Sequence, residues 1–428
     1  MTKKEDTTKT EKAKDKISPI KVFQNYFANE LQTNKTQETI KFNEEEITNV
    51  TNLTKRIHNF FKVPYNFEIS ILYGILLVLD IFFHYVVIYP LKNLVSAYQK
   101  YFKKNKISEQ KMVDLIVFCI CLFILFIVSQ INFYTLLEGI HESHMKLMFL
   151  YNALELLDGV FTPFSLQTID SLSLAIYEHN VQTGKKKFFD KKVIIEIIIT
   201  TFVLLTHTCI LFTSVVMVGI SLTSKKLSMI SFLLRNNWIE FKQTIMKRHT
   251  QRSMRNIFRE DCFERVKLYL FTYSVIAEDI GSPEFNINND QRSTLKWLVL
   301  AEFIVDWSKN AFVVKNNDIS PKVFKSFRSK LAQIAWVSHN QDTENAYTET
   351  IQKEMGFAMI PFIILFFKVT IAAIWNNYSF FLFCFYLSAF FLLLSLIAII
   401  IKFVHLFFMK RYAILYRSEK KTTQKKDK

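Results

Sequence analysis

Long apolar runs alternate with short, strongly basic stretches along this chain. The apolar runs cover residues 69–89, 113–133, 193–222, 356–375 and 378–408. A helix needs about 20 apolar residues to cross the hydrocarbon core of a bilayer, and each run meets that length. The sequence therefore predicts an all-α, polytopic helical membrane protein with roughly five to six membrane spans and a cytosolic amphipathic-helical domain.

The segment from Met145 to Ala175 leaves the number of spans open. Its apolar part carries Asn152 and Glu155, and Asp158 follows just beyond. Ionisable groups at membrane depth are costly and usually face protein or water. Two interpretations remain: the segment crosses while other helices shield it, or it lies at the interface against the bundle.

The distribution of charge predicts five regions. They are a cytosolic N-terminal tail with a short amphipathic helix (1–68), an N-terminal membrane region (69–222), a basic cytosolic helical domain (223–355), a transmembrane hairpin (356–408) and a basic cytosolic tail (409–428). Residues 223–267 alone hold eleven Lys and Arg against four Asp and Glu, and cytosolic loops are enriched in Lys and Arg. A cytosolic N-terminus then requires an even number of crossings before Thr223. The lysine-rich loop Leu91–Met112 would become luminal, so a re-entrant hairpin of the first two spans is the alternative.

The stretch Ser228–Arg248 has the pattern of a basic amphipathic helix. Apolar residues recur at helical spacing among four cations, Arg235, Lys242, Lys247 and Arg248. Such a helix binds a surface that is apolar below and anionic above. We expect it to lie on the anionic cytosolic leaflet of the bilayer; an ordinary surface helix of a soluble domain is the alternative.

The ionisable residues inside the apolar runs include Asp80, His84, Glu196, His207 and Lys368. Asp80 and His84, spaced i and i+4, indicate either a packing hydrogen bond or part of a polar pathway. Glu196 and His207 lie on one polar stripe, which favours a hydrogen-bonded seam between helices over a conduction path. Lys368 is too deep to reach either interface, so we expect it to pair with Asp80 or Glu196.

Composition excludes several other classes of protein. Half of the residues are hydrophobic, 43 are Phe and the net charge is +16. The cations cluster at the ends of apolar runs and in the tails, without the interleaved aromatic residues of a nucleic-acid groove, so we expect no nucleic-acid partner. No catalytic, cofactor-binding or metal-ligating pattern is present, which predicts a protein that is not an enzyme. Lys425 and Lys426 stand where a dilysine retrieval signal for the endoplasmic reticulum stands; chance in a lysine-rich tail is the alternative.

Several stretches of the chain resemble the Tapt family, the transmembrane anterior posterior transformation proteins. They include RIHNFFKVPYNFE from Arg56, RNNWIEFK from Arg235, DCFERVKL from Asp261, EFIVDWSKNAFVVKNNDI from Glu302 and MGFAMIPFIILFFKV from Met355. The most specific parts are the block with Asn236, Asn237 and Glu240 and the block with Asp306, Trp307 and Lys309.

The resemblance implies a multi-pass membrane protein of the endoplasmic reticulum. It further implies a SUN-like-domain membrane partner and a role as a scaffold that supports folding or quality control of newly made luminal proteins. A channel or transporter that uses the ionisable residues of the bundle is the alternative function.

Overall fold

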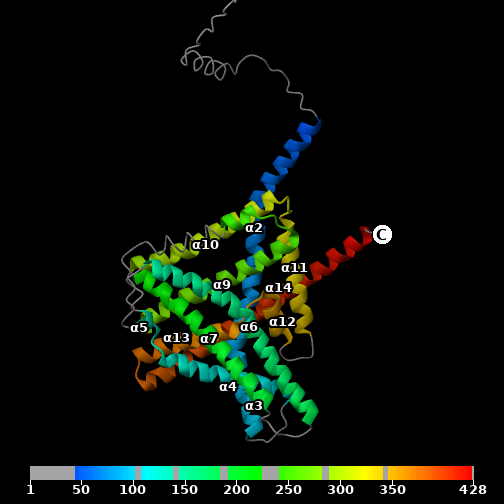
Figure 1. Cartoon of the computed structure of the whole chain (residues 1–428). Coiled ribbons are helices and arrows are strands. Elements are labelled where there is room, and N and C mark those ends of the chain that lie inside the picture. The colour runs from blue at the N-terminus through cyan, green and yellow to red at the C-terminus, as the bar shows by residue number, and fades with distance from the viewer. Residues whose placement is uncertain are drawn as a thin grey trace, which may run out of the picture. The chain divides into compact units, whose positions relative to one another are not determined.

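The computed structural model describes residues 44–101, 108–137, 144–183, 191–223, 241–281, 289–340 and 346–426, and every regular element within them is a helix (Figure 1). The predicted all-α, polytopic fold is therefore confirmed. The chain divides into two units, residues 1–54 and 55–428. In the first unit the described residues, 44–54, form the start of helix α2. All contacts reported below lie within the second unit.

The described helices follow one another along the chain. In order they are α2 (Glu44–Phe83), the π-helical turn η1 (His84–Ile88), α3 (Tyr89–Tyr101), α4 (Glu109–Gln130), α5 (Phe133–Leu137), α6 (His144–Thr183), α7 (Lys191–Thr223), α9 (Gln251–Gly281), α10 (Asn289–Asn316), α11 (Lys322–His339), α12 (Ala346–Met355), α13 (Met359–Asn377) and α14 (Phe380–Lys426). Residues 241–246 add a short helical segment before α9.

Five of the described helical segments are long and apolar enough to cross a membrane. They are Leu53–Tyr101, Glu109–Gln130, Lys191–Ile220, Met359–Asn377 and Phe380–Arg417. Each of them overlaps one of the five apolar runs found in the sequence. Helix α6, which covers the doubtful segment from Met145, is not among them, because its polar residues lower its hydropathy.

Two pairs of helices organise the bundle. Helices α6 and α7 form an antiparallel pair, since Ser171 contacts Glu196 near one end and Ser165 contacts His207 further along. Helix α9 runs parallel to α13. Phe263, in the middle of α9, makes ring contacts with Phe357 and Phe362 around the start of α13. Tyr273 stacks on Phe366 further along. The Asn376 amide donates to the Gly281 carbonyl where both helices end.

Close approach of helices depends on two glycines. A Cβ atom at Gly74 in α2 would lie 2.5 Å from the Cys262 Sγ atom of α9, and one at Gly281 would lie 2.8 Å from the Ala373 Cα atom of α13. Contacts this short are not compatible with a larger side chain at an unchanged helix separation. Both glycines therefore let α9 pack tightly against its neighbours.

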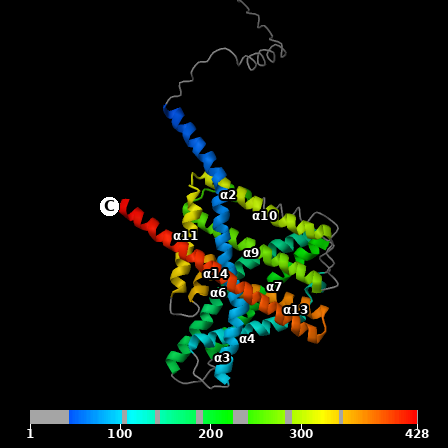
Figure 2. The same cartoon turned by 180° about the vertical axis from the view of Figure 1, so that it is seen from behind.

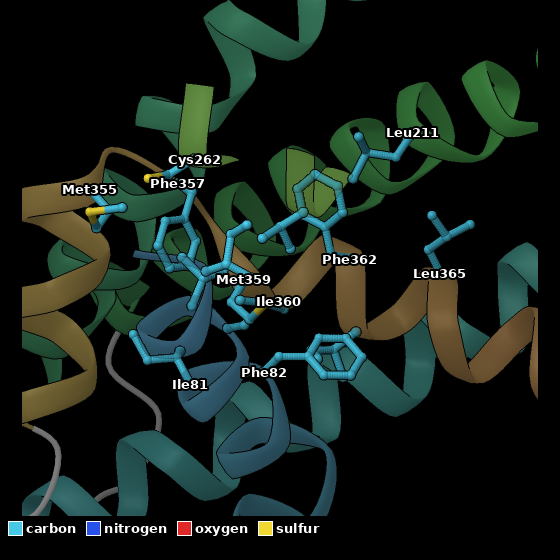
Figure 3. Packing of buried hydrophobic residues seen from close by; sticks show 14 of the residues in the cluster. Ile81, Phe82, Leu211, Cys262, Met355, Phe357, Met359, Ile360, Phe362 and Leu365 are labelled. Carbon is cyan, nitrogen blue, oxygen red and sulfur yellow. The ribbon is translucent and has the colours of Figure 1, made fainter. Parts of the chain in front are cut away.

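The core of the bundle is built from apolar residues of helices that are distant in sequence (Figure 3). Met359, Ile360 and Phe362 at the start of α13 are buried against Ile81 and Phe82 of α2 and against Cys262 of α9. Helix α14 passes behind α2 in the view of Figure 1 and in front of it in Figure 2, and Lys402 contacts Asp80 where the two cross.

Helices α9 to α12, from the region predicted as a cytosolic domain, belong to the same compact unit as the spans. Helix α9 packs along α13 from the first turn of α13 to its last residues. The helices of residues 223–355 are thus packed on the membrane helices. Their location on the cytosolic side stays a prediction.

Candidate functional site

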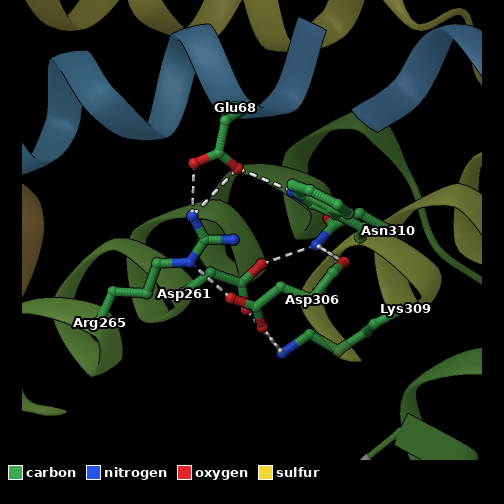
Figure 4. Close-up of polar contacts among 7 residues, drawn as sticks. Glu68, Asp261, Arg265, Asp306, Lys309 and Asn310 are labelled. Carbon is green, nitrogen blue, oxygen red and sulfur yellow. Dashed lines mark hydrogen bonds and ion pairs between the residues drawn. The ribbon is translucent and has the colours of Figure 1, made fainter. Parts of the chain in front are cut away.

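A buried cluster of charged residues joins α2, α9 and α10 (Figure 4). We call it the motif cluster, and it consists of Glu68, Asp261, Arg265, Asp306, Trp307, Lys309 and Asn310. The Arg265 guanidinium donates from Nε to Asp306 Oδ2 at 2.8 Å and from Nη1 to Glu68 Oε1 at 2.9 Å. Lys309 Nζ lies 2.6 Å from Asp261 Oδ1 and 3.5 Å from Asp306 Oδ1. Three helices are therefore tied together by one continuous set of ion pairs.

Neutral side chains complete the motif cluster. The Trp307 indole N–H donates to Glu68 Oε2 at 2.8 Å, and the Asn310 amide donates to Asp261 Oδ2 at 2.7 Å. The Arg265 guanidinium also lies over the ring of Phe303, 4.3 Å from its centroid. Burying a charge is costly unless it is paired and hydrogen-bonded, and these contacts supply both conditions.

The motif cluster holds three carboxylates and two cations, so it would carry one negative charge if every group were ionised. Asp306 and Asp261 are both fully buried. Burial, together with the neighbouring charge of Asp261, raises the pKa of Asp306 to about 8. The raised pKa favours retention of a proton on Asp306 near neutral pH, which lowers the net negative charge of the cluster.

Helical spacing places these groups on facing surfaces. Asp261 and Arg265 lie one turn apart on α9, and Asp306, Lys309 and Asn310 lie on one face of α10, because residues three and four apart share a helix face. Asp306, Trp307 and Lys309 were expected from the sequence as a specific motif, and the structure brings them together. Glu68, Asp261, Arg265 and Asn310 were missed as site residues. The signal available for Asp261 and Arg265 was their opposite charges at i and i+4 within a segment of helical apolar period.

Asp80 lies in a second polar cluster, which joins α2, α12 and α14. Its Oδ2 atom accepts from the Tyr347 hydroxyl at 2.8 Å and lies 3.1 Å from both Lys402 Nζ and His405 Nδ1. His84, one turn further along, begins the π-helical turn η1 and is not among the groups that contact Asp80. The Asp80 carboxylate is thus used for packing between distant helices.

His207 and Glu196 form the polar seam that the sequence predicted. His207 Nε2 lies 2.9 Å from Asp158 Oδ1 and its Nδ1 lies 2.8 Å from the Ser165 hydroxyl, while Ser171 donates to Glu196 at 3.0 Å. Lys267 of α9 completes the seam with an ion pair to Asp158. Asp158 and Ser165 of α6 are therefore buried against α7 and α9, whereas Asn152 and Glu155 of the same helix are exposed.

Lys368 has an acidic partner, but the expected partners were wrong. Its Nζ atom lies 3.3 Å from Glu278 Oε1 of α9 rather than near Asp80 or Glu196. The sequence placed Glu278 outside the membrane region, so it was not considered. Parallel packing of α9 on α13 carries this carboxylate to the depth of Lys368.

Two large cavities open between the helices. One, of about 860 Å³, is lined by residues of η1, α3, α4, α6, α12 and α13, and its ionisable groups include Asp114, Asp170, Glu349 and Lys353. Lys353 pairs with Asp170 at 2.9 Å, and burial raises the pKa of Glu349. The other, of about 790 Å³, contains Lys368 and Glu278.

Other expected site residues lie at the periphery. Lys242, Lys247 and Arg248 are exposed, as a membrane-surface role requires, whereas Arg235, Asn236, Asn237 and Glu240 lie outside the described residues. Lys425 and Lys426 are the last two residues of α14. Membrane binding by Ser228–Arg248 and retrieval by the lysine pair stay predictions.

Within the described ranges, no group of three His, Cys, Asp or Glu residues is arranged to hold a metal ion.

Comparison with known proteins places the chain among eukaryotic membrane proteins. Residues 107–418 match a family described as the eukaryotic membrane protein family. The human transmembrane anterior posterior transformation protein 1 homolog is 23% identical over 347 residues, which cover 78% of this chain and 60% of the human protein. A Caenorhabditis elegans relative, protein TAPT1 homolog, is 21% identical over 318 residues, covering 74% of this chain and 44% of its own length. This chain thus aligns with less than two thirds of either relative. No solved structure matches.

Proposed function

Because the chain belongs to the TAPT1 family of eukaryotic membrane proteins, we propose that it is a non-enzymatic scaffold in the membrane of the endoplasmic reticulum. In this proposal it forms a complex with a SUN-like-domain membrane protein and supports folding or quality control of newly made luminal proteins. The observation that carries the proposal is the use of the motif residues. Asp306, Trp307 and Lys309 are occupied in contacts between helices, which suits a framework better than a reactive site.

The surface of the spans supports a role in assembly. In the most apolar part of α14 only 11% of the residues are buried, against 61% in the corresponding part of the first span. Phe385, Leu392, Leu396 and Phe403 are all more than half exposed, and their spacing places them along one stretch of helix surface. This face is available to lipid or to the transmembrane helix of a partner, and we assign it to the partner.

Alanine substitution separates the two occupants of the α14 face. Lipid tolerates a change of shape, whereas a packed helix interface does not. We expect Phe385, Leu392 and Leu396 changed together to Ala to lose the SUN-like-domain partner from a purification in mild detergent, with partners identified by mass spectrometry. The matched control changes Ile195, Ile198 and Phe202, an exposed set on α7, to Ala and should retain it.

The functional part of the proposal needs its own measurement. Cells that lack the protein should degrade a newly made luminal reporter faster, and the parent chain but not the α14 variant should restore its half-life. Recovery of no SUN-like-domain protein with the parent chain would contradict the partner. An unchanged reporter half-life in cells lacking the protein would contradict the role in folding.

A channel or transporter is the second candidate function. The cavity around Lys368 and Glu278 supports it, because an ion pair that borders a cavity at membrane depth is an arrangement that transport pathways use. Reconstitution of the purified chain in planar bilayers tests this alternative. Conductance that is lost in Lys368→Met would favour it over the scaffold.

A further inference from the structure

The ends of three helices meet around the cavity that contains Lys368. Its wall includes Gln130 at the end of α4, Phe133 of α5, Phe212 of α7, Glu278 of α9, and Lys368 and Trp375 of α13. We propose that this cavity binds the headgroup of a phospholipid that carries both a phosphate and a primary ammonium, the ethanolamine type of head.

The position of the cavity along the spans suits a lipid headgroup. Helix α4 ends at Gln130 and α13 ends at Asn377, and both helices are candidate spans. The Asn376 amide donates to the Gly281 carbonyl at 2.6 Å, so α9 ends at the same level. At a rise of about 1.5 Å per residue, the Cα atom of Glu278 lies about 5 Å and that of Lys368 about 14 Å before the ends of their helices, and the two side chains meet between these levels. In this proposal the helix ends lie at the membrane surface, so the cavity extends from there toward the first part of the acyl chains.

The ion pair in the cavity has capacity for further partners. Lys368 Nζ lies 3.3 Å from Glu278 Oε1, longer than the 2.7 to 2.9 Å of a close charged hydrogen bond. On another side the ring of Phe212 covers the ammonium, with its centroid 3.3 Å from Nζ. An ammonium has three N–H donors and a carboxylate has about four acceptor positions. Both groups can therefore bind a ligand while they remain near each other.

The opposite charges of the pair select for a ligand with two charges. A phosphate would be attracted to Lys368 but repelled by the like charge of Glu278. A lone cation would be attracted to Glu278 but repelled by Lys368. A head that carries both charges can place its phosphate at Lys368 and its ammonium at Glu278. A primary ammonium can donate hydrogen bonds to the carboxylate, whereas a choline head has no N–H group.

The size and walls of the cavity fit the head and the start of the acyl chains. Its volume of about 790 Å³ lies within the range of about 300 to 1,000 Å³ usual for ligand pockets. Leu122 and Phe126 of α4 line the cavity and are also more than half exposed. They provide an apolar path along which the chains can pass from the cavity to the surrounding bilayer.

The test uses the full chain, purified in detergent and depleted of lipid. Binding of phosphatidylethanolamine, phosphatidylcholine, phosphatidic acid and diacylglycerol is measured by native mass spectrometry. We expect phosphatidylethanolamine to bind at least tenfold more tightly than the other three. Lys368→Gln should reduce its affinity at least tenfold, and Glu278→Gln should reduce it to that of phosphatidylcholine. Lys402→Gln, which alters the ion pair with Asp80, is the matched control and should leave the affinity unchanged.

Equal binding of all four lipids, or unchanged affinity in Lys368→Gln, would overturn the proposal. If the variants do not fold, the parent chain is labelled with a phosphatidylethanolamine that carries a photoreactive group in the first part of one acyl chain. Labelling of α4 and α13 peptides that line the cavity would support the site, and labelling only elsewhere would refute it. Neither result depends on a protein partner, so the site and the scaffold can fail separately.

Discussion

Replacement of Arg265 by Met is the most direct test of the motif cluster. Arg265 is 1% exposed and pairs with Asp306 of α10 and Glu68 of α2. Met keeps most of the side-chain volume between Phe303 and Phe67, which the guanidinium now contacts, but it supplies neither charge nor donors. The change therefore isolates the electrostatic contribution of Arg265.

Removal of one partner from a buried ion pair costs about 3 to 5 kcal/mol, since a buried charge is left uncompensated. Two features place Arg265→Met at the lower end of this range. The Glu68 side chain is 23% exposed, so water can solvate it in part. Asp306, whose pKa burial and Asp261 raise to about 8, can hold a proton at neutral pH. We expect a loss of about 3 kcal/mol near pH 7.

Thermal unfolding of the purified chain in detergent measures this loss. The double variant Arg265→Met, Asp306→Asn removes the buried carboxyl group that has lost Arg265 as its partner and should recover part of the lost stability, because the effects of contacting residues do not add. Arg56→Met is the matched control. Arg56 pairs with Asp318, and their side chains are 48% and 56% exposed, so its removal should cost about 1 kcal/mol or less.

The reasoning would be refuted if Arg265→Met were as stable as Arg56→Met. It would also be refuted if the double variant were less stable than Arg265→Met alone. Either result would mean that the packing of α9 against α2 and α10 does not depend on these ion pairs.

Three further predictions follow from other positions. The pKa of Asp306 in the folded protein is raised to about 8 from its usual 3.8, so the stability of the fold should decrease as pH rises from about 4 to 8. Asp306→Asn should make the thermal midpoint depend less on pH. An unchanged pH dependence of the midpoint would contradict the raised pKa of Asp306. Gly281→Val should destabilise the chain by about 2 kcal/mol or more, since overpacking alone costs about 1 to 3, and Gly159→Val, where an added Cβ meets nothing within 4 Å, is the control. A peptide of residues 228–248 should lose about 1 kcal/mol of binding free energy to anionic vesicles for each of Arg235, Lys242, Lys247 and Arg248 that is neutralised. Equal binding of the peptide to neutral and anionic vesicles would contradict this prediction.

Local patterns in the sequence were enough to predict the fold class and the membrane spans. Apolar runs of about 20 residues have few stable alternatives to a transmembrane helix, because an unpaired backbone polar group in hydrocarbon costs several kcal/mol. This property is local, so the five candidate spans could be predicted without knowledge of any contact. The polar stripe with Glu196 and His207 was also predictable, since the face of a helix depends only on spacing.

Which charged residues pair with each other depends on how distant helices pack. Lys368 pairs with Glu278 because α9 packs parallel to α13, and Arg265 reaches Glu68 because α2 passes close to α9. These partners are 90 and 197 residues apart in the chain. Spacing along one helix contains no information about which face of which other helix it will meet. The position of α9 beside a span could not be predicted for the same reason. Its charged residues lower its hydropathy, and the residues that pair with them lie on other helices, including α2, α10 and α13.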